Sequence, residues 1–158
     1  MERTPRNGET TLLRLETPAH AESIQVARRA AETLERLHGS EDVRARLAIV
    51  VTELATNVVK HSNGRKIEVE LKLSPGRLTG FVRDDGRGFA QSKRGLPRPD
   101  ATGGRGLYLL QSLTDEWDVD TSDGTRVSFA FALDNPDADA PLSRAAAAPR
   151  SDAAPRGG

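Results

Sequence analysis

The amino-acid sequence predicts an α+β fold, a two-layer α/β sandwich in which a mixed, mostly antiparallel sheet is covered on one face by helices. Residues 67–73 and 78–82 alternate between apolar and polar side chains, as the two strands of a hairpin do. Residues 21–37 and 40–61 instead carry apolar side chains at helical spacing. A second pair of short strand patterns lies within residues 117–133 and supplies further strands for the same sheet.

The N-terminal elements follow in order. Thr10–Glu16 alternates loosely and is expected to form a strand, and Pro18 starts the turn after it. Ala21–Leu37 has the pattern of an amphipathic helix that should be closed by Gly39. The two strands of the central hairpin are joined by a turn at Ser74-Pro75-Gly76.

The C-terminal elements begin with a long loop. Gly86–Gly104 is rich in Gly, Arg and Pro and is expected to be irregular. A helix should follow at about Arg105–Asp115, and then two short strands at Trp117–Thr121 and Thr125–Leu133. Asp123-Gly124 between these strands is a typical hairpin turn.

The domain organisation is indicated by composition. Residues 134–158 are dominated by Pro, Ala, Asp and Arg, with Leu142 as the only large aliphatic side chain. Such a segment buries too little apolar surface to offset the entropy of ordering, so we expect a disordered tail. Residues 1–9 are polar in the same way and should form a flexible N-terminus. The folded domain is therefore expected to span residues 10–133.

The composition also disfavours several classes of function. The 158 residues, 17.1 kDa, fit one domain, and 23 basic residues balance 23 acidic ones, which disfavours nucleic acid as a partner. There is no Cys, so disulfides, thiolate zinc sites and cysteine nucleophiles are excluded, and the three His residues are too scattered to suggest a metal cluster. No apolar run approaches the roughly 18 residues of a membrane span, and no signal peptide is recognised. We therefore expect a soluble, cytoplasmic protein that does not associate with membranes.

The helix expected between Ser40, its N-cap, and His61 carries two stripes of different chemistry. The apolar stripe contains Leu47, Val51, Leu54 and Val58. Glu53, Asn57 and Lys60 recur at i, i+4 and i+7 at the edge of the apolar layer, where polar groups need partners. Mg²⁺ with phosphate would suit them, because this ion takes oxygen ligands and keeps several waters. An amphipathic helix with a wide polar side would show the same pattern.

A second motif lies at the end of the expected strand Arg77–Asp84. Asp84 shares the inward parity of Leu78 and Val82, whereas Asp85 points the other way. An inward carboxylate followed by Gly86 and Gly88 suits a planar group that bears an amino donor, such as adenine. A turn at the exit of a hairpin uses the same residue types and is the alternative.

A third motif precedes the helix expected at residue 105. Gly103-Gly104-Arg105-Gly106 stands where the first amides of that helix lack intrahelical partners, so phosphates would dock there. Six basic side chains lie between residues 83 and 105 against three acidic ones, as expected of a loop that closes over a polyphosphate. A solvated glycine-rich connector is the alternative. Thr125 also has inward parity at the start of the last strand, although Thr is common in strands.

In this order, the motifs resemble those of the GHKL, or Bergerat-fold, ATP-binding domains of gyrase and histidine kinases. The Walker A and protein-kinase motifs are absent. The resemblance covers Thr10–Leu133 and implies a histidine-kinase-like ATPase fold, with an N box at Glu53–Lys60 and glycine boxes at Asp84–Gly88 and Gly104–Gly106. TELATNVVKHS, VRDDGRGF and GGRGLYLLQSLTDEWDV are most similar to the small bacterial anti-sigma factor serine/threonine-protein kinases.

The resemblance implies a role for each motif residue. Asn57 would be the Mg²⁺ ligand and Glu53 the general base. Asp84 would hydrogen-bond to adenine, with Thr125 assisting. The remaining nucleotide-binding residues would be Lys60, Gly86, Gly88, Gly104, Arg105 and Gly106.

The implied function is that of an ATP- and Mg²⁺-dependent regulatory kinase. It would sequester a sigma factor, and so regulate transcription without contacting nucleic acid, and it would phosphorylate an anti-anti-sigma antagonist on Ser or Thr. Its relatives are commonly homodimers. Two alternatives stay open: a nucleotide-dependent binding module with little or no chemistry, and a partner-switching regulatory kinase that does not hold a sigma factor.

Overall fold

The computed structural model describes residues 8–34, 37, 40–86 and 105–133. The expected loop after Gly86 and the expected disordered tail at 134–158 therefore lie outside the described residues. The same holds for the expected flexible N-terminus, apart from Gly8 and Glu9. No helix in the described ranges is long and apolar enough to cross a membrane.

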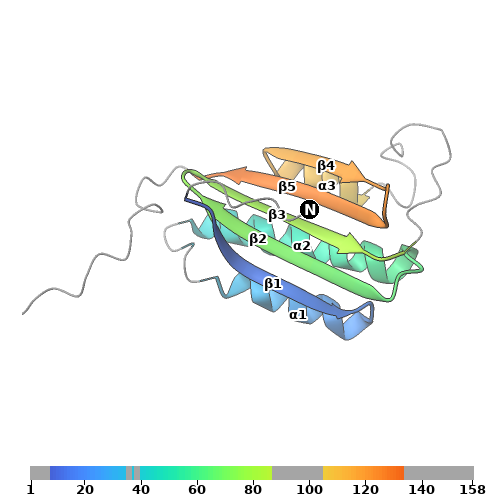
Figure 1. The fold of residues 1–158 in the computed structure, drawn as a ribbon. Coiled ribbons are helices and arrows are strands. Elements are labelled where there is room, and N and C mark those ends of the chain that lie inside the picture. The colour runs from blue at the N-terminus through green and yellow to red at the C-terminus, as the bar shows by residue number, and fades with distance from the viewer. Residues whose placement is uncertain (1–7, 35–36, 38–39, 87–104, 134–158) are drawn as a thin grey trace, which may run out of the picture.

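The described residues form a five-stranded sheet and three helices, and the helices lie together on one face of the sheet (Figure 1). The strand order is β1-β2-β3-β5-β4, and all four pairings are antiparallel. The elements are β1 (Thr10–Pro18), α1 (Ala21–Glu32), α2 (Glu41–His61), β2 (Lys66–Ser74), β3 (Arg77–Asp84), α3 (Arg105–Leu113), β4 (Glu116–Asp120) and β5 (Thr125–Ala132). The predicted two-layer α+β sandwich is confirmed, and its sheet is antiparallel throughout the described strands.

The hairpin of β2 and β3 lies at the centre of the sheet. Its registered pairs run from Ser74 and Arg77 beside the turn to Ile67 and Asp84 at the open end. The turn places Gly76 at a φ of +66°, a conformation that glycine adopts without steric cost. Strand β3 also pairs with β5, so both edges of β3 are hydrogen-bonded. The end of β3 is therefore held firmly from both sides.

The core lies between the sheet and the helices. All four residues of the predicted apolar stripe of α2 are buried: Leu47, Val51, Leu54 and Val58. From the sheet, the alternating residues of β2 and the ring of Phe131 in β5 are buried against this layer. Ile49, by contrast, is 45% exposed, so the apolar layer of α2 is narrower on that side than the sequence predicts.

One predicted helix boundary is wrong. Helix α1 ends at Glu32 and not at Leu37, because the Thr33 hydroxyl donates a hydrogen bond to the carbonyl of Arg29 at 3.0 Å in the last turn. Leu37 is still buried, outside the regular helix. Ser40 is the N-cap residue of α2, as predicted, although its side chain makes no capping hydrogen bond. The other helix and strand boundaries agree with the sequence predictions to within two residues.

Candidate functional site

Asp84 is a buried carboxylate at the end of the central strand. It is 2% exposed and faces the helical layer, as its parity predicts. Its Cα partners are Ile67 on β2 and Thr125 on β5. Oδ1 accepts two hydrogen bonds, from the Ser62 hydroxyl at 2.8 Å and from the Gly86 amide at 2.7 Å. No hydrogen bond from the described residues reaches Oδ2, which is therefore available as an acceptor.

Ser62 connects the end of α2 to Asp84. Its own amide donates to the carbonyl of Val58 at 3.0 Å and closes the last turn of the helix. Its hydroxyl oxygen accepts a hydrogen bond from the amide of Gly64 at 2.9 Å. The sequence prediction ended this helix at His61 and assigned no role to Ser62. A hydroxyl residue directly before an Asn-Gly turn was the available signal.

Two glycines permit the close packing of chain around Asp84. A Cβ on Gly86 would lie 2.5 Å from the Ser62 hydroxyl and 2.7 Å from Oδ1 of Asp84, closer than real Cβ contacts. Gly124 has a φ of +80°, and a Cβ there would collide with the backbone carbonyl oxygen of Asp84. The turns after α2, after β3 and before β5 therefore meet at this carboxylate.

Asp85 has a different role from its neighbour. It is exposed, and its Oδ1 accepts hydrogen bonds from the backbone amides of Arg65 at 2.7 Å and Lys66 at 2.9 Å. The backbone hydrogen bond from Lys66, supported by the one from Arg65, holds the pKa of the Asp85 carboxyl below its ordinary range. Asp85 thus fixes the loop that leads into β2, while Asp84 keeps one acceptor atom to which no described residue donates.

The predicted polar stripe of α2 divides between two environments. Glu53 and Asn57 are half-buried, whereas Lys60 is exposed in the last turn of the helix. The prediction that all three lie at the edge of the apolar layer is therefore wrong for Lys60. No hydrogen bond within the described chain engages the side chain of Glu53 or Asn57.

The remaining predicted residues lie at one end of the fold or outside the described chain. Thr125 is buried opposite Asp84, as its parity predicts. Arg105 and Gly106 open α3, which lies beside α2 (Figure 1), and Leu110 of α3 is buried in the core. Gly88 and Gly104 lie outside the described residues. The structure thus joins the Asp84 and Thr125 motifs directly, and connects the end of α2 to them through Ser62.

The sequence shows which family has this arrangement. Residues 17–131 match the family described as "Histidine kinase-like ATPase domain", and the matched stretch contains Glu53, Asn57, Asp84 and Thr125. The chain belongs to this family. The predicted GHKL-type resemblance is therefore confirmed.

Known relatives of this histidine kinase-like ATPase domain include serine-protein kinases. The chain is 30% identical over 137 residues to the serine-protein kinase RsbW of Bacillus licheniformis, a match that covers 77% of this chain and 85% of that protein. The serine-protein kinase RsbW of Bacillus subtilis is 28% identical, with the same coverage.

A solved structure supports the fold independently of the sequence relatives. The histidine kinase domain of the blue-light activated histidine kinase from Erythrobacter litoralis EL346 is similar with a TM-score of 0.50 and 21% identity. The match covers 76% of this chain and 63% of that domain, so this chain spans less than two thirds of it. This likeness concerns the fold alone.

The donor set of this ATPase domain fits Mg²⁺ together with phosphate. No group of three or more His, Asp or Glu side chains among the described residues is placed to hold a metal ion alone. The Asn57 side chain offers one amide oxygen that no described residue occupies, and Glu53 lies one turn before it. An ion that keeps phosphate oxygens and waters as its other ligands needs no more from the protein.

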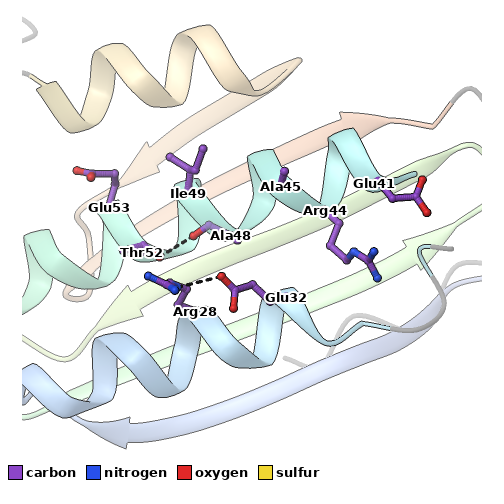
Figure 2. Close-up of a pocket in the computed structure, with 9 residues that line it drawn as sticks. All are labelled: Arg28, Glu32, Glu41, Arg44, Ala45, Ala48, Ile49, Thr52 and Glu53. Carbon is purple, nitrogen blue, oxygen red and sulfur yellow. Dashed lines mark hydrogen bonds and ion pairs between the residues drawn. The ribbon is translucent and has the colours of Figure 1, made fainter. Parts of the chain in front are cut away.

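A groove between α1 and α2 is separate from the Asp84 site (Figure 2). It is lined by Arg28 and Glu32 of α1 and by residues of α2 that include Thr52 and Glu53, but by neither Asp84 nor Thr125. Arg28 donates to Glu32 across one turn at 2.9 Å, so these two charges satisfy each other. Figure 2 shows Glu53 extending from the side of α2 away from α1. Glu53 thus belongs only to the rim of this groove.

Proposed function

We propose that this chain is an ATP-dependent serine/threonine-protein kinase that sequesters a sigma factor and phosphorylates an anti-anti-sigma partner. The main support is the environment of Asp84, a buried carboxylate beside a glycine that permits close approach, with one oxygen to which no residue in the described ranges donates. The similarity to serine-protein kinases supports phosphoryl transfer to a protein hydroxyl as the reaction. We propose a cytoplasmic homodimer that carries no direct contact to nucleic acid.

Each predicted residue has a defined task in nucleotide binding. Oδ2 of Asp84 accepts a hydrogen bond from the 6-amino group of adenine. Thr125, the residue paired with Asp84 on β5, assists in binding adenine through its hydroxyl. Asn57 holds Mg²⁺, and bound Mg²⁺ supplies positive charge against the phosphates. The glycine backbone lies under the nucleotide, while basic side chains and the first amides of α3 hold the phosphates; the residues assigned are Lys60, Gly86, Gly88, Gly104, Arg105 and Gly106.

The transfer itself needs a base and alignment. Glu53 accepts the proton of a Ser or Thr hydroxyl on the partner as that oxygen attacks the γ-phosphorus. The bond between this phosphorus and the bridging oxygen to the β-phosphate breaks, and ADP leaves with that oxygen. Positioning and charge stabilisation provide most of the acceleration in phosphoryl transfer.

Nucleotide binding is tested first by thermal unfolding with and without Mg·ATP. A ligand at about a hundred times its Kd stabilises the folded state by about 2.7 kcal/mol, so the wild type should melt at a higher temperature with Mg·ATP. Asp84→Asn should lose most of this shift, because an amide group can present a donor to the adenine amino group. Asp118→Asn, an exposed change on β4, is the control. Unchanged melting of the wild type in millimolar Mg·ATP would contradict nucleotide binding.

The chemistry is tested separately with Glu53→Ala. General-base assistance is typically worth about 10²- to 10⁴-fold, so transfer of labelled γ-phosphate to the antagonist should fall in this range while nucleotide and sigma-factor binding persist. Equal labelling by wild type and variant would exclude Glu53 as the base. If the wild type binds a partner in a nucleotide-dependent way but never transfers labelled phosphate to any partner, the chain is instead a nucleotide-dependent binding module.

A further inference from the structure

The two oxygens of the Asp84 carboxylate have unequal environments. Oδ1 accepts hydrogen bonds from Ser62 and Gly86, and Oδ2 accepts none from the described residues. We propose that Ser62 is a positioning residue that fixes this asymmetry and thereby sets how strongly the site recognises the 6-amino group of a purine. The inference rests on the proposed function, in which Asp84 binds adenine.

The direction of the Ser62 hydrogen bond follows from its neighbours. A serine hydroxyl has one proton to donate and two lone pairs that accept. The Gly64 amide donates to one of these lone pairs at 2.9 Å, and a carboxylate can only accept. The single proton of Ser62 is therefore directed at Oδ1 of Asp84, 2.8 Å away.

Ser62 is itself held rigidly. Its backbone is the C-cap of α2, where its amide donates to the carbonyl of Val58 at 3.0 Å. The chain of Gly86 packs against the hydroxyl so closely that a Cβ there would lie 2.5 Å from it. The hydroxyl therefore has little freedom to move away from the carboxylate.

Two donors on one oxygen define how the carboxylate is turned. With Oδ1 occupied by Ser62 and Gly86, the rotation of the Asp84 side chain is fixed and Oδ2 is presented as a lone acceptor. An N–H at position 6 of a purine satisfies this atom, whereas a purine without that group leaves it unpaired. Without Ser62, the Gly86 amide is the one donor left among the described residues to fix the carboxylate, and the acceptor loses its defined direction.

The test combines one substitution with one change in the ligand. Wild type and Ser62→Ala are each titrated with Mg·ATP and with the Mg²⁺ complex of purine riboside triphosphate, which lacks the 6-amino group. Hydrogen bonds to charged groups predict that the wild type prefers ATP by roughly 10- to 100-fold. In Ser62→Ala this preference should shrink by about tenfold, mostly through weaker ATP binding, while affinity for the analogue changes little.

The outcomes are distinguishable. If Ser62→Ala weakens both nucleotides equally, or binds ATP as the wild type does, Ser62 does not position the carboxylate. If the wild type binds neither nucleotide, the proposed function fails and this inference fails with it.

Two further variants guard against a purely structural effect. Ser62→Cys keeps nearly the same volume but has a weaker donor, and it should reduce the preference for ATP in the same direction even if the alanine variant unfolds. An unchanged preference in Ser62→Cys would overturn the inference. Ser74→Ala removes a hydroxyl from the turn at the opposite end of the central hairpin and should leave the preference unchanged.

Discussion

Gly124 sets a strict steric limit beside the candidate site. Its φ is +80°, and a Cβ on it would collide with the carbonyl oxygen of Asp84. We expect Gly124→Ala to lower the free energy of unfolding by about 2 kcal/mol or more, since strain and collision add. Urea denaturation measures the loss. Gly76→Ala is the matched control, because Gly76 also has a positive φ, +66°, but open space around it, and it should cost only about 1 to 2 kcal/mol. Equal losses would show that the collision is relieved.

Glu70 provides a pH-dependent contribution to stability. It is buried on the face of the sheet opposite the helices, where Arg14 donates to its Oε2 at 2.5 Å and Lys72 lies 3.4 Å from Oε1. Burial alone acts to raise the pKa of this carboxyl, but the hydrogen bond from Arg14 and the charge of Lys72 together lower it below its ordinary value of 4.5.

A lowered pKa in the folded state gives a stabilisation that is complete above the ordinary value and is lost as the pH falls through the folded value. We therefore expect Glu70→Gln to be less stable than the wild type at about pH 7. The difference should begin to shrink as the pH falls below the ordinary value of 4.5, and it should be lost once the pH is below the lower folded-state pKa, where both chains carry an uncharged group. Urea denaturation across this range measures it, and a difference that does not change with pH would contradict the role of the charge.

Residue by residue, the sequence predicts side chains on regular elements better than side chains in turns. The inward positions of Asp84 and Thr125 follow from strand parity and are confirmed. The hydroxyl before the Asn-Gly turn marks Ser62 as a turn residue, but its partner does not follow from local sequence, because the contact with Asp84 spans 22 residues and depends on how two loops meet. The tasks of Glu53 and Asn57 stay predictions, since periodicity places them on α2 but says nothing of a ligand.

Among the described side chains of α3, Leu110 is the one buried in the core, and Leu113 packs against the core beside it. Leu110 is 1% exposed, whereas Tyr108 on the same helix is 61% exposed. We expect Leu110→Ala to destabilise the fold by about 2 to 4 kcal/mol through lost burial and a cavity. Because α3 begins at the proposed phosphate site, the variant should also bind Mg·ATP more weakly. Thermal unfolding and nucleotide titration measure the two effects. Tyr108→Ala is the control on the same helix and should change stability by less than about 1 kcal/mol.

The elements differ in how well their boundaries can be predicted from the local sequence. Strands β2 and β3 follow directly from period-two alternation and a tight turn. Helix α1 was predicted too long, because its apolar spacing continues past Thr33, while the hydroxyl of Thr33 closes the last turn on Arg29. Apolar periodicity marks which residues are buried, as it does for Leu37, but does not decide where the helical hydrogen bonds end.

For the whole molecule, we expect residues 10–133 to fold without the segment that follows. Deleting residues 134–158 should leave the melting temperature and the Mg·ATP-induced shift essentially unchanged, because this composition offers almost no apolar surface to a core. The deletion should retain Leu133, which is buried and donates its amide to the carbonyl of Gly76. A cooperative loss of several degrees would show that the segment docks.

The position of β1 at the edge of the sheet has a consequence for the order of folding. Its partner β2 lies far along the chain, so that Arg14 and Glu70 are 56 residues apart. The hairpins β2–β3 and β4–β5 close over only a few residues. Loop-closure entropy should therefore make the two hairpins form first and β1 join last, although β1 is synthesised first. In pulsed hydrogen exchange during refolding, amides of β3 should become protected before those of β1, and the nascent chain must keep β1 unpaired until β2 has left the ribosome.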